Sequence, residues 1–241
     1  LTHLFEQSNA SYTAFVGGIF QDSKTNMMSR GNTYTLVEAD EFDRSFLHLR
    51  PTIACITSMD LDHLDVYSDA ASLQAAYVEF TSRVKKALFV EKNIALNGIT
   101  YSVSEEADFY IDAIKPDASG SYFDLHTPDG VYKNQFFNQL GMHNLSNALV
   151  ALAMASKAGL QLQDLVKSLA TFPGVQRRLQ VLINNDNRVL IDDYAHHPTE
   201  IKAVYETLKL SFPTEEKCVV FQPHLFSRTQ DFMTDFARVL S

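Results

Sequence analysis

Two groups of acidic residues each follow a short apolar run, and they are the first feature of this sequence that suggests chemistry. The first group is Glu38, Asp40, Glu41 and Asp43, and the second is Asp60, Asp62, His63 and Asp65. If both runs are adjacent strands of an open parallel sheet, these groups lie outside the carboxyl ends of the strands, where such sheets bind ligands. Divalent cations prefer carboxylate oxygens, and an imidazole can join them. The pattern predicts a metal site that handles phosphate, although single acids also cap helices and fill turns.

A second set of polar residues follows two strand-like runs near the end of the sequence. The set is Asp192, Asp193, Tyr194, His196 and His197 after the first run, and His224 and Arg228 after the second. Right-handed connections between parallel strands place both loops at one edge. Histidine can move protons near neutral pH, and arginine can clamp a carboxylate, so the set suits an amino-acid substrate. For His197 alone we prefer helix capping and packing.

The composition is that of an ordinary globular protein with a sizeable core. The chain has 241 residues, of which 46% are hydrophobic and 20% charged. A net charge of −9 argues against a general nucleic-acid or anionic-membrane binder, and an acidic protein that handles phosphate is expected to use magnesium. Cys55 and Cys218 lie in apolar runs, which indicates buried free thiols in a reducing, cytoplasmic compartment. No apolar run reaches membrane-spanning length.

Hydrophobic periodicity predicts an α/β domain over the first part of the chain. We expect helices over 1–9 and 70–86, and strands over 14–16, 33–37, 52–57 and 87–90, with a loop over 27–31. Gly17-Gly18 makes a tight turn or lets a ligand approach the backbone. Turn signals near Pro116, Gly120 and Pro128 then favour an antiparallel meander of four strands over 99–103, 107–114, 121–126 and 131–139.

The rest of the chain predicts two helices, a linker and the start of a second domain. Helices are expected over 141–157 and 162–170, and Phe172-Pro173-Gly174 is the linker, which divides the chain into domains 1–174 and 175–241. After it we expect strands over 179–183, 188–191 and 217–221, with helices over 198–210 and 229–240. These strands are too few to close a sheet, so we expect the second domain to be incomplete here. Arg177-Arg178 beside the linker either reaches a phosphate or forms a solvated turn.

Five segments of this sequence together resemble the Mur ligases, and the resemblance covers nearly the whole chain. The segments are Glu38 to Phe46, Asp62 to Tyr67, His143 to Ala148, Asp192 to Glu200 and Phe221 to His224. The resemblance implies a central ATPase domain, with a mostly parallel sheet and an antiparallel meander, followed by the start of a Rossmann-like ligase domain. A UDP-substrate domain and a phosphate-binding loop would precede residue 1, since no G-x-x-x-x-G-K-[ST] motif occurs in the sequence.

The resemblance also implies a role for particular residues. Glu38 and His63 would each hold a magnesium ion. Contacts to ATP would come from Asn144 and Asn147 at adenine, Arg178 at the phosphates and Asp193 at the ribose. The amino-acid end would be formed by Tyr194, His196, His224 and Arg228, with His196 or His224 as general base. Some members carry a basic residue where this chain has Leu225, which leaves Arg228 as the arginine for the carboxylate.

Within the family, the branch that adds L-alanine to UDP-N-acetylmuramate is the nearest. The implied reaction uses ATP and magnesium to form an acyl phosphate, which the amine of alanine attacks. A murein-tripeptide recycling ligase, a metal-dependent phosphohydrolase and a non-catalytic binding module remain alternatives. Because a phosphate loop supplies the backbone N–H groups that hold the anion, we expect residues 1–241 alone to be inactive.

Overall fold

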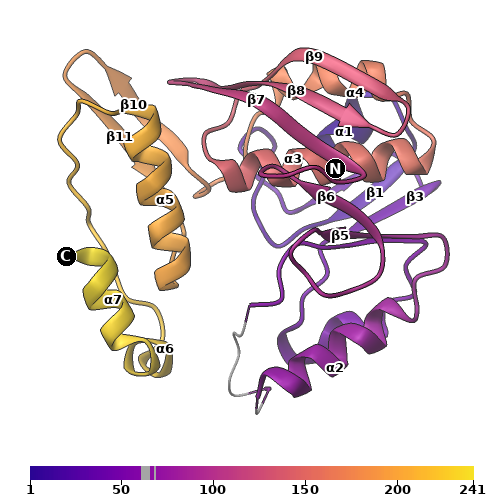
Figure 1. The fold of residues 1–241 in the computed structure, drawn as a ribbon, viewed down its shortest axis with the longest axis horizontal. Coiled ribbons are helices and arrows are strands. Elements are labelled where there is room, and N and C mark those ends of the chain that lie inside the picture. Colours follow the sequence, from indigo (N-terminus) through magenta and orange to yellow (C-terminus); the bar gives the residue numbers. More distant parts are fainter. Residues whose placement is uncertain (61–65, 68) are drawn as a thin grey trace.

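The computed structural model describes residues 1–60, 66–67 and 69–241 and shows a mixed α/β architecture (Figure 1). The first part contains α1 (Thr2–Gln7), β1 (Tyr12–Phe15), β2 (Met27–Ser29), β3 (Tyr34–Val37), η1 (Phe42–His48), β4 (Ile53–Ile56), α2 (Ala70–Thr81) and β5 (Ala87–Glu91). Next come β6 (Ile99–Ser102), β7 (Phe109–Asp117), β8 (Gly120–Thr127), β9 (Gly130–Phe137), α3 (Met142–Ala158), α4 (Leu162–Ser168) and η2 (Leu169–Thr171). The last elements are β10 (Gln180–Asn185), β11 (Arg188–Asp192), α5 (Pro198–Ser211), α6 (Phe226–Asp231) and α7 (Met233–Leu240). None of the helices in the described residues is long and apolar enough to cross a membrane.

The strands of the first part form two sheets. The larger sheet has the order β4-β5-β6-β7-β8-β9, with parallel pairing from β4 to β7 and antiparallel pairing from β7 to β9. The smaller sheet has the order β2-β1-β3, in which β1 and β3 are parallel. The mostly parallel sheet with an antiparallel end confirms the predicted fold class. The prediction of a four-strand antiparallel meander was wrong at its start, because β6 pairs in parallel with both neighbours.

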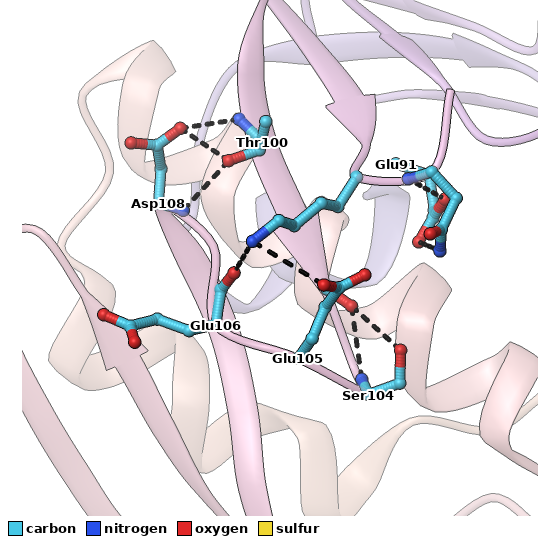
Figure 2. Close-up of polar contacts among 9 residues, drawn as sticks. Glu91, Thr100, Ser104, Glu105, Glu106 and Asp108 are labelled. Atoms are coloured by element: carbon cyan, nitrogen blue, oxygen red, sulfur yellow. Dashed lines mark hydrogen bonds and ion pairs between the residues drawn. The ribbon is translucent and has the colours of Figure 1, made fainter. Parts of the chain in front are cut away.

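A polar network holds the short connection between β6 and β7 (Figure 2). Parallel neighbours normally need a connection of about a dozen residues or more, yet only 103–108 separate these two strands. The Asp108 carboxylate accepts hydrogen bonds from the Thr100 backbone N–H at 2.8 Å and its hydroxyl at 2.7 Å, and these bonds lower the pKa of Asp108. Lys92 donates to the Glu106 carbonyl and lies 3.8 Å from the Glu105 carboxylate. Turn signals in the sequence do not reveal such a network, so the strand direction was missed.

The core lies on both faces of the larger sheet. On one face, Ile53 and Cys55 pack into the main cluster, which α3 dominates with its fully buried Leu149. On the other face, Ala54 and Ile56 pack with η1 and α2. The alternation follows from the two-residue period of a strand, whose successive side chains point to opposite faces. The two helical layers fix the ends of the strands, where the predicted functional residues lie.

The C-terminal part lies to one side of these sheets (Figure 1). It consists of the two-stranded antiparallel sheet β10-β11 and the helices α5, α6 and α7, of which α5 contacts α7 and β7. The predicted strand over 217–221 was wrong, since this segment is neither helix nor strand and Val220 is 96% exposed. A strand needs a hydrogen-bonding neighbour, and the segment pairs with none of the described strands. The last predicted helix is instead two helices that meet at Phe232.

Three smaller predictions also need correction. The loop expected over 27–31 contains β2, which pairs antiparallel with β1 through backbone groups that no side-chain pattern reveals. Helix α2 ends at Thr81 rather than near residue 86. Cys218 is exposed rather than buried, because the segment 217–221 does not enter a sheet, whereas Cys55 is partly buried and its thiol pKa is raised to about 12 by burial.

Leu149→Ala should lower the free energy of unfolding by about 2–5 kcal/mol, because it leaves a cavity in the main cluster. The matched control is Leu210→Ala on α5, where the side chain is 59% exposed and the loss should stay below about 0.5 kcal/mol. Urea unfolding followed by circular dichroism measures both. Equal losses in the two variants would contradict this placement of the core.

Candidate functional site

Glu38 is fixed at the end of β3 by a backbone group at the end of β1. The Gly17 N–H donates to Glu38 Oε2 at 2.7 Å, and a Cβ at position 17 would lie 3.1 Å from Oε1. The close approach at this glycine therefore serves Glu38. The second oxygen, Oε1, makes no hydrogen bond or ion pair with the residues that the structure describes. A cation held by one carboxylate together with phosphate oxygens and water fits this arrangement, since magnesium is commonly bound in that way.

The second acidic group of the predicted metal site follows a strand that belongs to a different sheet from the strand before Glu38. Strand β4, which precedes Asp60, is the edge of the larger sheet, whereas β3 belongs to the smaller sheet. The prediction of adjacent strand ends was therefore wrong, because the spacing of two apolar runs does not show which strand lies between them or beside them. His63 lies outside the described residues. Within the described residues, no group of three or more His, Cys, Asp or Glu side chains could hold a metal.

The residues after Gly17 contact the start of the C-terminal part. A Cβ at Gly18 would lie 2.7 Å from Val175 Cγ1, so the missing side chain lets the two segments meet. The Gln176 N–H donates to the Ile19 carbonyl at 2.9 Å, and Phe20 and Val175 form an isolated antiparallel bridge. Residues 17–20 thus contact Glu38 at one end and the segment just before the two arginines at the other.

Asp193 holds that turn together. Its Oδ2 accepts the Leu179 N–H at 2.7 Å and its Oδ1 accepts the Ala195 N–H at 2.7 Å. Arg177 and Leu179 both have left-handed backbones, with φ of 57° and 43°, a conformation that costs energy for residues other than glycine. The carboxylate therefore stabilises a strained turn, and its role as a ribose contact stays a prediction.

The start of α3 meets the same turn. Asn144 and Asn147 lie on one side of its first turns, and the Asn144 amide donates to the Leu140 carbonyl at 2.8 Å. Burial lowers the pKa of the neighbouring His143, while the Asp193 carboxylate acts on this ring in the opposite direction. A Cβ at Gly141, the residue before α3, would lie 3.0 Å from Leu179 Cδ1, so the start of α3 lies against the turn that Asp193 holds.

Three aromatic rings form a cluster that begins at the residue after Asp193. The Tyr194 ring centroid lies 4.9 Å from that of His196 and 6.2 Å from that of His224, and the two histidines are 5.7 Å apart. The loops after residues 192 and 221 therefore lie side by side, as the sequence predicted, although no strand forms over 217–221. The cluster brings together two imidazole rings and a phenol. Such groups can bind an amine or accept a proton from it.

The ring of His196 has a defined tautomer. Its Nδ1 lies 2.7 Å from the Tyr194 carbonyl oxygen, which can only accept, so Nδ1 carries the proton. In the neutral ring, Nε2 then holds the free electron pair. Nδ1 is also 3.6 Å from Glu200 Oε2, which would compensate a positive charge on the ring.

Glu200 and His197 fix the start of α5. The Glu200 carboxylate accepts the backbone N–H of His196 at 2.8 Å and of His197 at 3.1 Å, and His197 Nδ1 accepts the Thr199 N–H at 3.3 Å. This reciprocal capping agrees with the preferred role of His197. Its ring also packs edge-on against Phe232 at 4.6 Å.

The remaining predicted residues occupy contrasting environments. Arg178 is exposed in the turn, whereas Arg228 on α6 is 7% exposed. Leu225, the residue before α6, has a positive φ of 69° and is 56% exposed.

The sequence assigned no role to Glu200 or His143 and considered Arg177 only together with Arg178, as a phosphate contact or part of a solvated turn. Glu200 could have been found, since a glutamate three residues after a capping residue is a helix-start signal. No pattern in the sequence separates Arg177 from Arg178 or aims His143 at the turn.

Comparisons with known proteins agree with this architecture. Residues 19–155 match the model of the Mur ligase middle domain, and residues 177–241 match that of the Mur ligase, glutamate ligase domain. The chain is 48% identical over its whole length to the UDP-N-acetylmuramate–L-alanine ligase of Flavobacterium psychrophilum and 47% identical to that of Christiangramia forsetii, and it covers 54% of each. A crystal structure of UDP-N-acetylmuramate-alanine ligase from Thermotoga maritima superimposes with a TM-score of 0.82 at 26% identity, covering all of this chain and 55% of that one. The chain thus spans about half the length of the curated relatives that it matches.

Asp193→Ala should lower the free energy of local opening of the turn by about 2–3 kcal/mol, because two backbone N–H groups lose a charged acceptor. Asp192→Ala is the matched control, since within the described residues the Asp192 side chain makes a single contact, 3.9 Å from Arg177 at the surface. Hydrogen exchange at the amides of Leu179 and Ala195 measures the change directly. Protection that is equal in both variants would show that Asp193 does not hold the turn.

Proposed function

Because this chain belongs to the Mur ligase family, we propose that the protein carrying it is an ATP-dependent ligase that joins L-alanine to UDP-N-acetylmuramate. The observation behind this proposal is the turn held by Asp193, in which Leu179 lies against Gly141 at the start of α3, while the next residue, Tyr194, packs with the rings of His196 and His224. A ligase of this kind must hold a nucleotide and an amine close together. The names of the relatives supply the substrates, and we expect the reaction to take place in the cytoplasm during peptidoglycan precursor synthesis.

The nucleotide end would be formed by residues around the start of α3. Asn144 and Asn147 supply amide groups for adenine, Asp193 lies where the ribose would bind, and exposed Arg178 is available for the phosphates. Glu38 would hold one magnesium ion through the oxygen that Gly17 leaves unused, and His63, which lies outside the described residues, is proposed to hold a second magnesium ion. Bound magnesium would neutralise charge at the transferred phosphoryl group.

The amine end would be formed by the ring cluster. The alanine amine must be neutral to attack, so a base is required. His196 is the better candidate, because its proton on Nδ1 is committed to the Tyr194 carbonyl and Nε2 is left to accept one. His224 lies beside it and Arg228 is proposed for the alanine carboxylate.

The reaction proceeds in two steps in this proposal. The muramoyl carboxylate attacks the γ-phosphorus of ATP, which releases ADP and gives an acyl phosphate with a good leaving group. The amine of alanine then attacks the acyl carbon, its proton passes to Nε2 of His196, and phosphate leaves. A phosphohydrolase would use neither the amide groups of α3 nor the paired histidines, so we do not favour that alternative.

The test is to purify the full-length protein and measure ADP formation with UDP-N-acetylmuramate, ATP and magnesium. L-Alanine should support turnover, whereas a murein tripeptide in its place should support about a hundredfold less, since this proposal assigns the amine end of the site to alanine. Mass spectrometry identifies the product. Turnover with tripeptide but not with alanine would overturn the proposed substrate.

Arg228→Lys should raise the KM for L-alanine about tenfold or more and change the KM for ATP little, because lysine cannot make the paired hydrogen bonds of a guanidinium. Arg238→Lys on α7 is the matched control, since Arg238 is paired with Asp235 at the surface, and it should change neither constant. Initial rates at varied alanine and varied ATP measure both. An unchanged alanine constant in Arg228→Lys would remove this residue from the site.

A further inference from the structure

We propose that Arg177 is a positioning residue for the amino-acid end of the site, so that the adjacent arginines Arg177 and Arg178 serve opposite ends of the reaction. The inference rests on the proposed function for its substrates, but its contacts are independent of that function. It replaces the simpler idea that both arginines of the turn face phosphate.

Arg177 contacts Tyr194 through both its side chain and its backbone. The guanidinium carbon lies 4.5 Å from the centroid of the Tyr194 ring, within the range of a cation–π contact. The Arg177 carbonyl accepts the Tyr194 N–H at 2.8 Å. Arg177 Nε is 3.9 Å from the Asp192 carboxylate, on the residue two before Tyr194. These contacts direct the side chain toward the ring cluster.

The turn itself separates the two arginines. Arg177 has a left-handed backbone, and its N–H donates to the Gln180 side chain at 3.0 Å, which fixes the direction from which the chain enters residue 178. Leu179, the residue after Arg178, lies against the start of α3, because a Cβ at Gly141 would be 3.0 Å from Leu179 Cδ1, and the charge of Arg178 acts on the His143 ring there. Arg178 therefore lies toward the proposed nucleotide end, and Arg177 lies toward the proposed amine end.

The Tyr194 ring needs an external support. Its hydroxyl makes no hydrogen bond with the residues that the structure describes, and the side chain is 37% exposed. The orientation of the ring therefore depends on its contacts with Arg177 and with the rings of His196 and His224. Removing the guanidinium frees one face of the ring and lets it turn away from the histidines.

The first arm of the test uses kinetics in the full-length protein. Arg177→Ala should raise the KM for L-alanine about threefold to tenfold and leave the KM for ATP within about twofold, as expected for the loss of one cation–π contact. Alanine has the same backbone restriction as arginine at a left-handed position, so the turn is not relaxed by the change. The matched control Arg178→Ala should show the reverse pattern, with the larger change in the KM for ATP.

The second arm asks whether Arg177 acts through Tyr194. Tyr194→Leu removes the ring, so adding Arg177→Ala to it should raise the alanine constant no further. Effects of the two changes that multiply would overturn the proposal, because Arg177 would then act independently of the ring. An ATP constant that rises in Arg177→Ala as much as the alanine constant would overturn it too, by placing Arg177 at the nucleotide.

The third arm requires no turnover, and so separates this proposal from the proposed function. In protein with isotope-labelled histidine, the ring C–H signals of His196 and His224 report the position of the Tyr194 ring through its ring current. Arg177→Ala should move both signals, and Arg178→Ala should leave them in place. Unmoved signals in Arg177→Ala would overturn the positioning role even in an active ligase, whereas moved signals in a protein that does not use alanine would overturn only the substrate.

Discussion

The two hydrogen bonds that the Asp193 carboxylate accepts are the constraint on which the rest of the candidate site depends. They tie Leu179, at the end of a turn with two left-handed residues, to Ala195, just before α5. A left-handed backbone at a residue other than glycine persists only where its surroundings hold it. A carboxylate suits this task, since it offers only acceptors and can satisfy two N–H groups with separate oxygens. The turn is therefore specified by one side chain.

This constraint links the two ends of the proposed reaction. The charges of Asp193 and Arg178 act on His143 at one end, while the residue after Asp193 carries the ring that Arg177 covers at the other. A shift of the turn would move the nucleotide groups and the amine groups together. The same turn is joined to the smaller sheet by backbone pairing near Val175 and by the packing of Gly18, so Glu38 is connected to it as well.

The sequence predicted the parts of this fold that depend on local chemistry. Helices α3 and α5 were found from their periodicity, from Gly159 and from Pro198, because helix starts and stops are set by nearby residues. The direction of β6 was not found, since it depends on the network of Lys92, Thr100 and Asp108 across three segments. The run 217–221 has the composition of a strand, but composition does not supply the neighbour that a strand requires.

The site shows the same division. The motif from Asp192 to Glu200 identified the ring cluster, because its residue types are unusual and close in sequence. The different directions proposed for the Arg177 and Arg178 side chains were not predictable from the sequence. Two adjacent arginines are distinguished only by the backbone angles of the turn. The adjacency of Glu38 and His63 was predicted from strand order that the sequence does not contain, and the structure places β3 and β4 in different sheets.

The tautomer of His196 shows how the constraint at Asp193 would reach the chemical step. The Tyr194 carbonyl fixes the proton on Nδ1 of His196, and the ring of the same tyrosine packs under Arg177. One residue thus sets both the direction of Nε2 and the shape of the space beside it. When Nε2 takes a proton from the amine, the new positive charge lies near Glu200, which is already fixed by the two N–H groups at the start of α5. The turn therefore orients the proposed base, His196, and Glu200 at the start of α5 compensates its positive charge. Both the orientation and the charge compensation are present before the substrate binds.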